Sequence, residues 1–325
     1  MPIRLATSDD LSMVMEILNL TTLDLLEKGI YQWEHPWDEA LVLEQINRQE
    51  LHLVRFKQRD VAAFVLSPAQ IEPDSWYFKQ FAILPEFQRQ FLGSMVMYLV
   101  RGMHDLLYLD CYAGAEGLKQ FYRSCGFEEV GDFPENDYEI TRFKSDTRLP
   151  VLETDRLMLR KIQPADSPDM FEYLSDPEVM KFIDWDLQKN ISQTEFLIKE
   201  MRSPEIKMWA ILEPGSGKMI GNISLCEGQG TGHAELGFNL ARSYWNQGLM
   251  TEAVNAILNF GFVEMGLEGI TARTVPENKA CAKLLEKVGM VYECRLMSDA
   301  WINGQAFDTL KYAIYREEYR KEVNG

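Results

Sequence analysis

The sequence predicts an α/β (α+β) fold built as two similar domains in tandem, and three observations lead to this prediction. Residues 234–240 alternate apolar and polar side chains, as a strand with one buried face does. After Gly248 the apolar residues recur every three or four positions, which is typical of an amphipathic helix. The same order of strands and helices occurs in both halves of a chain of 325 residues, a length that suits two domains.

The first half begins with a strand and two helices, and strands then alternate with two further helices. Polar residues such as Ser8, followed by apolar residues at helical spacing, mark helix starts. Runs of apolar and aromatic residues between polar turns mark strands. In chain order we expect a strand at 3–5, helices at 11–28 and 38–48, strands at 50–56, 61–66 and 76–83, a helix at 94–103, a strand at 107–111, a helix at 117–124, and strands at 128–133 and 138–143.

The second half is organised around its glycine loop. The strand at 234–240 leads through Gly248 into a helix whose apolar face extends to Val263. The apolar run 269–275 predicts the next strand. A further helix opens with Pro276 and polar residues and ends at Gly289, because proline suits the start of a helix and glycine its left-handed C-cap.

Aligning Gly126 with Gly289 superimposes the two halves and indicates a duplicated domain, since a period near 150 residues is too long for a solenoid. We expect the domains to span 1–146 and 150–325, joined by a polar linker that contains Pro150. The alignment places Phe91, Ala115, Leu118 and Tyr122 of the first half on Gly248, Asn278, Cys281 and Leu285 of the second, in that order.

Composition excludes several classes of function. A formal net charge of −17 argues against nucleic acid as a partner, because binding it needs a basic surface. Such a charge suits a cationic substrate, or serves solubility alone. Five scattered cysteines without a CxxC pair and four separated histidines predict free thiols and no metal site. No apolar run long enough for a membrane span and no secretory signal are found, so we expect a cytoplasmic protein.

The Gly248 turn is a candidate phosphate-binding site. A helix that starts directly after a strand and a glycine leaves its first backbone N–H groups unpaired, and the positive end of its dipole favours an anion. Gly248 also lets the backbone approach a ligand without an intervening Cβ. Strand–glycine–helix units are common, however, and many of them are only structural.

The order of these motifs resembles a known family. After the glycine loop come the helix opening Pro276–Cys281, the helix end Val288–Met290 and the segment Trp301–Asp308, and the domain opens with Thr154–Arg160. Residues 152–320 thereby resemble the GCN5-related N-acetyltransferases (GNAT), and within them the branch that acetylates the N-termini of ribosomal proteins. The first half resembles the same family in three segments, 81–85, 109–114 and 121–122, together with Gln32-Trp33.

This resemblance implies a fold and a cofactor. Each domain is expected to hold a mixed sheet whose two central strands splay apart, with coenzyme A in the cleft between them. Acetyl-CoA is then the cofactor, its pantetheine arm pairing with the fourth strand and its pyrophosphate lying on the following loop. The implied cofactor-binding residues are Phe238, Asn239, Leu240, Asn246, Gln247, Gly248, Leu249, Met250, Thr251 and Asn278. Asn278 is equally suited to cap its helix.

The resemblance also implies catalytic candidates, each with a structural alternative. Glu235 on the central strand is the candidate base, or a paired surface glutamate. Cys281 replaces a serine of the family and is the candidate acid for the leaving thiolate, or a small buried residue. Tyr122 corresponds to the tyrosine acid of other branches, or packs its helix onto the sheet. Asp308 meets the ammonium of an acceptor, or fixes the hairpin around Asn303.

Two functions remain open at this point. The first is an acetyl-CoA-dependent N-acetyltransferase in which residues 150–325 acetylate a primary amine, either a protein N-terminus or a small molecule. The second is a non-catalytic acyl-CoA-binding or interaction protein. We expect the first domain to bind cofactor poorly, because Phe91 resists a positive φ and Ala115 replaces the asparagine. We also expect the two domains to pack together like a joined homodimer.

Overall fold

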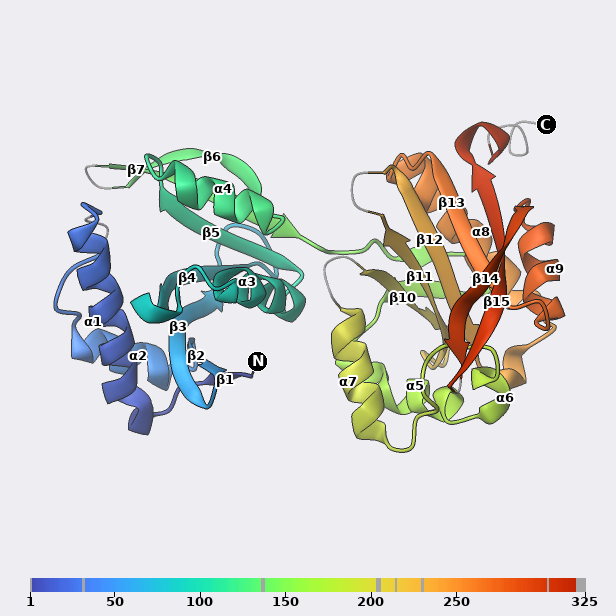
Figure 1. Ribbon diagram of the computed structural model, residues 1–325, viewed down its shortest axis with the longest axis horizontal. Coiled ribbons are helices and arrows are strands. Elements are labelled where there is room, and N and C mark those ends of the chain that lie inside the picture. The colour runs from blue at the N-terminus through green and yellow to red at the C-terminus, as the bar shows by residue number, and fades with distance from the viewer. Residues whose placement is uncertain are drawn as a thin grey trace. The chain divides into compact units, whose positions relative to one another are not determined.

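The computed structural model describes residues 2–30, 33–135, 138–202, 206–213, 215–228, 231–302 and 304–319. Gln32 and Asn303 lie outside the described residues. The chain divides into two compact units, Met1–Arg148 and Leu149–Gly325. Each unit has its own mixed sheet with helices packed on both faces, as Figure 1 shows. Within the described part of the chain, no helix is both long and apolar enough to cross a membrane.

The described residues of the first unit form a seven-stranded sheet in the order β1-β2-β3-β4-β5-β7-β6, in which only β4 and β5 are parallel. Alternate residues of the central strand β3 face opposite helix pairs. Val61 and Ala63 pack against α1 and α2, whereas Ala62 and Phe64 pack against α3 and α4. The strands are β1 (Ile3–Leu5), β2 (Leu51–Phe56), β3 (Arg59–Pro68), β4 (Trp76–Ile83), β5 (Leu106–Tyr112), β6 (Glu128–Glu135) and β7 (Tyr138–Asp146), and the helices are α1 (Leu11–Glu27), α2 (Glu39–Asn47), α3 (Leu92–Met103) and α4 (Glu116–Ser124).

The described residues of the second unit form an eight-stranded sheet in the order β14-β15-β13-β12-β11-β10-β9-β8, again with one parallel pair, β12 and β13. Trp209 and Ile211 pack toward α8, and Met208 and Ala210 toward α5 and α7. The strands are β8 (Leu152–Glu153), β9 (Met158–Lys161), β10 (Ile206–Leu212), β11 (Met219–Glu227), β12 (His233–Leu240), β13 (Gly269–Thr274), β14 (Val291–Ile302) and β15 (Gln305–Tyr315), and the helices are α5 (Ser167–Leu174), α6 (Pro177–Met180), α7 (Ile191–Met201), α8 (Leu249–Asn259) and α9 (Lys279–Lys287). The helix expected to open with Pro276 begins three residues later, because Asn278 is its N-cap.

The parallel strands of each unit separate soon after they meet. In the described residues β12 pairs with β13 only from His233 to Glu235, and β4 pairs with β5 only at Trp76 and Tyr77. Beyond Glu235 none of the described strands lies along the edge of β12 that faces β13. The splayed, mixed sheet flanked by helices that was expected for each domain is thus confirmed.

Backbone torsions repeat at the aligned positions of the two units. Ala115 and Asn278, which precede α4 and α9, have φ/ψ of −88/69° and −82/69°. Phe91 and Gly248, which precede α3 and α8, have φ of 61° and 77°. Phe91 therefore adopts the left-handed conformation that we expected it to resist, with its ring pointing into solvent at 85% exposure. A phenylalanine side chain at this position is therefore compatible with the same loop conformation as a glycine.

Candidate active site

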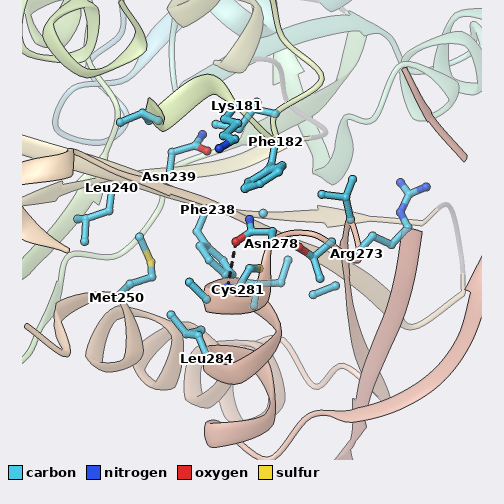
Figure 2. Close-up of a pocket in the computed structure, with 18 of the residues that line it drawn as sticks. Lys181, Phe182, Phe238, Asn239, Leu240, Met250, Arg273, Asn278, Cys281 and Leu284 are labelled. Atoms are coloured by element: carbon cyan, nitrogen blue, oxygen red, sulfur yellow. Dashed lines mark hydrogen bonds between the residues drawn. The ribbon is translucent and has the colours of Figure 1, made fainter. Parts of the chain in front are cut away.

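A cavity of about 910 Å³ opens where β12 and β13 separate. Its size lies within the range of small-molecule and cofactor sites. The backbone of Leu236–Leu240 forms one wall, and the start of α9 forms the opposite wall. Figure 2 shows Lys181 and Phe182, from the segment after α6, across the cavity from Asn278 and Cys281. The cavity is also lined by Asn246 and Gly248–Thr251, from the loop that is predicted to bind phosphate.

The loop before α8 has the geometry of an anion-binding site. Asn246 and Gly248 both have positive φ, at 59° and 77°. The first helical hydrogen bond runs from the Glu252 N–H to the Gly248 carbonyl (3.1 Å), so the N–H groups of the preceding residues 249–251 have no acceptor in the helix. The side chains of Leu249 and Met250 are buried in the core, which leaves their backbone to face a ligand. These features fit the pyrophosphate of a nucleotide cofactor.

The predicted cofactor strand divides its side chains between two environments. Leu240 is buried and packs into the core, and Figure 2 shows Phe238 beside Asn278 and Cys281. Asn239 faces the other way, and its Nδ2 donates to Asn222 Oδ1 (3.4 Å). β11 pairs with the other edge of β12 over these residues, so the backbone groups available to the amides of a pantetheine arm are those that point toward β13, from which β12 has separated beyond Glu235.

Asn222 belongs to a buried polar chain that the sequence did not reveal. It is 1% exposed, and its Oδ1 also accepts a hydrogen bond from the hydroxyl of Tyr173 on α5 (2.8 Å). Its Nδ2 donates to the sulfur of Met208 (3.4 Å). Tyr173 and Asn222 therefore fix the amide of Asn239 at the cavity wall. Its partners Tyr173 and Asn239 are 49 and 17 residues away in sequence, so local spacing cannot reveal these contacts.

Asn278 and Cys281 meet at the first turn of α9. The Asn278 Oδ1 accepts a hydrogen bond from the Cys281 N–H (3.2 Å), drawn in Figure 2, so Asn278 caps the helix while its amide group lines the cavity. Burial raises the pKa of the Cys281 thiol to about 11. The thiol is thus protonated at neutral pH and can donate a hydrogen bond. It is a weaker acid than an ordinary thiol of pKa about 8.5, so complete proton transfer to a leaving thiolate is unfavourable.

Glu235 is held by an arginine from the neighbouring strand. The Nε and Nη2 atoms of Arg273 donate to its two carboxylate oxygens at 2.7 and 2.9 Å. Arg273 Nη1 also donates to Asp299 (2.9 Å), which accepts a further hydrogen bond from Thr309 (2.6 Å). The bonds from Thr309 and Arg273 lower the pKa of Asp299. All these residues line the cavity, so two carboxylates share one guanidinium there.

Asp299 is a site residue that sequence reasoning missed. Its neighbour Ala300 is apolar, and the sequence pattern of this stretch did not single out Asp299. The register of β14 against β15 shifts between Leu296 and Ala300, and this irregularity places Asp299 beside Thr309. Strand periodicity read along the sequence cannot reveal such an insertion.

Asp308 fixes the same irregular stretch of β14. Its carboxylate accepts hydrogen bonds from Arg295 Nε (2.8 Å) and from the backbone N–H of Ser298 (2.9 Å). Ser298 has a positive φ of 52°, and this bond holds it there. Of the two roles considered for Asp308, the structure shows the one that fixes the hairpin.

Tyr122 lies in the first unit, among the rings of Phe121, Phe127 and Phe143. It is 8% exposed, and burial raises its pKa well above the ordinary value for tyrosine. These contacts are those of a residue that packs α4 onto the sheet. Among the described residues, no cluster of histidine, cysteine, aspartate or glutamate side chains is arranged to hold a metal ion.

A cleft between splayed parallel strands, with an anion-binding loop and a carboxylate among its lining residues, is an arrangement that fits a nucleotide cofactor. The profile of the acetyltransferase (GNAT) domain matches residues 156–291. The chain is 28% identical over 176 residues to the uncharacterized N-acetyltransferase p20 of Bacillus licheniformis (53% of this chain, 99% of p20). It is 31% identical over 173 residues to the uncharacterized N-acetyltransferase YnaD of Bacillus subtilis (52% and 98%).

The chain belongs to the GNAT family of acetyltransferases, whose cofactor is acetyl-CoA. The fold is also that of a probable GNAT-family acetyltransferase from Chromobacterium violaceum, at a TM-score of 0.50 and 17% identity over 53% of this chain and 90% of the other. The fold and enzyme class expected from the sequence are therefore confirmed.

Proposed function

We propose that the second unit, Leu149–Gly325, transfers the acetyl group of acetyl-CoA to a primary amine. The observation that supports this proposal most directly is the separation of β12 from β13 beyond Glu235. It places a carboxylate at the inner end of the cleft, where the free strand edge proposed to bind the pantetheine arm begins. The proposed cofactor-binding residues are those expected from the sequence, with Leu249 and Met250 acting through their backbone.

Glu235 is the proposed base. A primary amine with a pKa near 10 is protonated at neutral pH and must lose a proton before it can attack a carbonyl. Arg273 binds both oxygens of Glu235 and fixes the plane of the carboxylate, whose remaining lone pairs can accept the proton. Acetyl-CoA, when bound, supplies the activated acetyl group. The Cys281 thiol, which lines the cavity, is the proposed hydrogen-bond donor to the leaving thiolate.

The acceptor is proposed to be a protein N-terminus or a small amine. Glu235, Asp299 and Arg273 together carry one negative charge, which offsets the single positive charge of an ammonium group. Names of relatives such as p20 and YnaD agree with nitrogen as the acceptor atom. Release of thiol from acetyl-CoA, followed with a panel of peptides, polyamines and aminoglycosides, identifies the acceptor.

Replacement of the proposed base tests the mechanism and the active unit together. With an acceptor from the panel, Glu235→Gln should lower turnover at pH 7 by about 10²–10⁴-fold, the usual contribution of a general base. The deficit should shrink as the pH approaches 10, because the amine then deprotonates without help. The affinity for coenzyme A should stay unchanged.

Glu293→Gln is the matched control, because Glu293 also accepts two side-chain hydrogen bonds on this sheet, from Lys311 and Tyr315, and is not a cavity-lining residue. It should keep wild-type turnover. Wild-type turnover in Glu235→Gln would remove Glu235 from the mechanism. Substantial residual activity that persists when Gly248 is also replaced would assign the chemistry to the first unit instead.

The first unit is proposed to bind cofactor poorly. Its loop keeps the left-handed backbone at Phe91, so the proposed defect lies in the side chains. Ala115 offers no amide where the second unit has Asn278, and Met95 stands at the aligned position of Glu252 in the first turn of the helix. The first replacement removes an amide that lines the cleft of the second unit, and the second removes the carboxylate that binds Thr154 and Arg156 there.

A further inference from the structure

We propose that Arg156 is a positioning residue for the pyrophosphate loop, and that it acts through the carbonyl of Gln247 and the carboxylate of Glu252. This inference rests on the proposed function, in which that loop binds coenzyme A. Arg156 lies in the turn between β8 and β9, 91 residues before the loop, and nothing in the local sequence connects the two.

Glu252 anchors the Arg156 turn to the first turn of α8. Its Oε1 accepts hydrogen bonds from the Thr154 hydroxyl (2.5 Å) and the Arg156 N–H (2.8 Å). Its Oε2 accepts a hydrogen bond from Arg156 Nε (2.7 Å) and lies in an ion pair with Nη2 (2.6 Å). Burial alone would raise the pKa of Glu252, but these bonds outweigh it and lower the pKa. The carboxylate therefore stays ionised and holds the guanidinium in one orientation.

The remaining contact of Arg156 reaches the loop itself. Its Nη1 donates to the carbonyl oxygen of Gln247 (2.9 Å). In a planar trans peptide the carbonyl of one residue and the N–H of the next point in opposite directions. A Gln247 carbonyl directed at Arg156 thus turns the Gly248 N–H to the opposite side, away from the guanidinium. Rotation of this peptide plane is otherwise easy, because Gly248 tolerates both signs of φ.

The two units differ at this point. In both loops a glutamine side chain bonds a backbone carbonyl four residues earlier, from Gln90 to Glu86 and from Gln247 to Ser243. The first unit has Met95 where the second has Glu252, so it cannot build the same carboxylate anchor. The Glu252 carboxylate that holds Arg156 is thus present only in the unit that we propose to be catalytic. Both loops have the same backbone conformation, so that conformation does not depend on the carboxylate.

The test compares Arg156→Gln and Arg156→Lys in the full-length protein. Both should raise the dissociation constant of coenzyme A, measured by calorimetry, and the KM of acetyl-CoA by 10-fold or more, with kcat at saturation within twofold of wild type. S-acetylpantetheine lacks the pyrophosphate, so its kcat/KM should not change. Thr154→Val, which removes one donor to Glu252, should give a smaller loss and guards against misfolding of the arginine variants.

Arg316→Lys is the matched control, because Arg316 donates to the carbonyl of Leu267 (2.6 Å) beside another left-handed glycine, Gly266, in the same unit. It should leave coenzyme A binding unchanged. Wild-type affinity in both Arg156 variants would overturn the inference, and full affinity in Arg156→Lys alone would show a role for charge rather than positioning. Failure of the wild-type protein to bind coenzyme A would instead overturn the proposed function.

Discussion

Placing a negative charge at Gly248 should separate the cofactor role of the loop from its role in stability. Gly248 is exposed, and a Cβ built on it lies 3.6 Å from its nearest neighbour, Arg156 Nη2, so a side chain fits there without a clash. Its φ of 77° costs an ordinary residue about 1–2 kcal/mol. The loss of glycine entropy in the unfolded chain returns about 0.4–1 kcal/mol. Gly248→Glu and Gly248→Gln should therefore both lose about 1 kcal/mol of unfolding free energy, or about 2–4 °C in Tm.

Their affinities for coenzyme A should differ. A glutamate side chain reaches roughly 5 Å from its Cα, and repulsion of a phosphate charge at that distance is about 1–3 kcal/mol for an effective dielectric constant between 80 and 20. Gly248→Glu should thus bind coenzyme A about 10-fold or more weakly than Gly248→Gln. The gap should narrow as salt is raised from about 0.01 to 1 M, because the Debye length falls from about 30 to 3 Å.

Gly266→Glu is the control for this experiment. Gly266 also has a positive φ, of 68°, and its nearest neighbour is again an arginine nitrogen at 3.6 Å, Nη2 of Arg316. It should lose as much stability as the Gly248 variants and keep its affinity for coenzyme A. Equal affinities of the folded Glu and Gln variants at Gly248, measured by titration calorimetry, would refute the assignment of this loop to the pyrophosphate.

Three further predictions concern the cofactor stoichiometry of the first unit, its stability in acid and the reactivity of the half-buried Cys281 thiol. Calorimetric titration of the full chain should give one coenzyme A per chain, and a stoichiometry of two would contradict a degenerate first unit. Hydrogen bonds from Arg55 and Arg4 lower the pKa of Asp60, so this ion cluster stabilises the folded protein above the ordinary carboxyl range near 4 and is lost as the pH falls below it. Asp60→Asn should therefore destabilise the first unit at pH 7 much more than at pH 2, as followed by circular dichroism, and equal effects would contradict the role of charge. Alkylation of the half-buried Cys281, with its pKa of about 11, should be slow at pH 8 and accelerate as the pH approaches 11. The exposed Cys294 should be labelled faster at pH 8, and equal labelling of both by mass spectrometry would contradict the raised pKa of Cys281.

Local features of the second unit could be predicted from the sequence because each is determined by neighbouring residues. Alternation over 234–240 predicts β12, and a glycine followed by helical periodicity predicts the start of α8. Asn278 caps α9 through a bond to a residue three positions later. Phe91 marks the limit of such reasoning, because an intrinsic preference against positive φ was overruled by the packing of the strand and helix on either side.

What only the tertiary structure decided are the contacts that join distant segments. Arg273 binds Glu235, which lies 38 residues earlier in the sequence, and Asp299, which lies 26 residues later. The contact with Asp299 depends on the irregularity in β14. Arg156 reaches the Gln247 carbonyl only because the turn between β8 and β9, at one edge of the sheet, lies against the start of α8. Local spacing specifies which backbone each segment forms, because steric and hydrogen-bonding preferences act between near neighbours. The partner of a charged side chain depends instead on how the elements pack, and packing is set by the whole core.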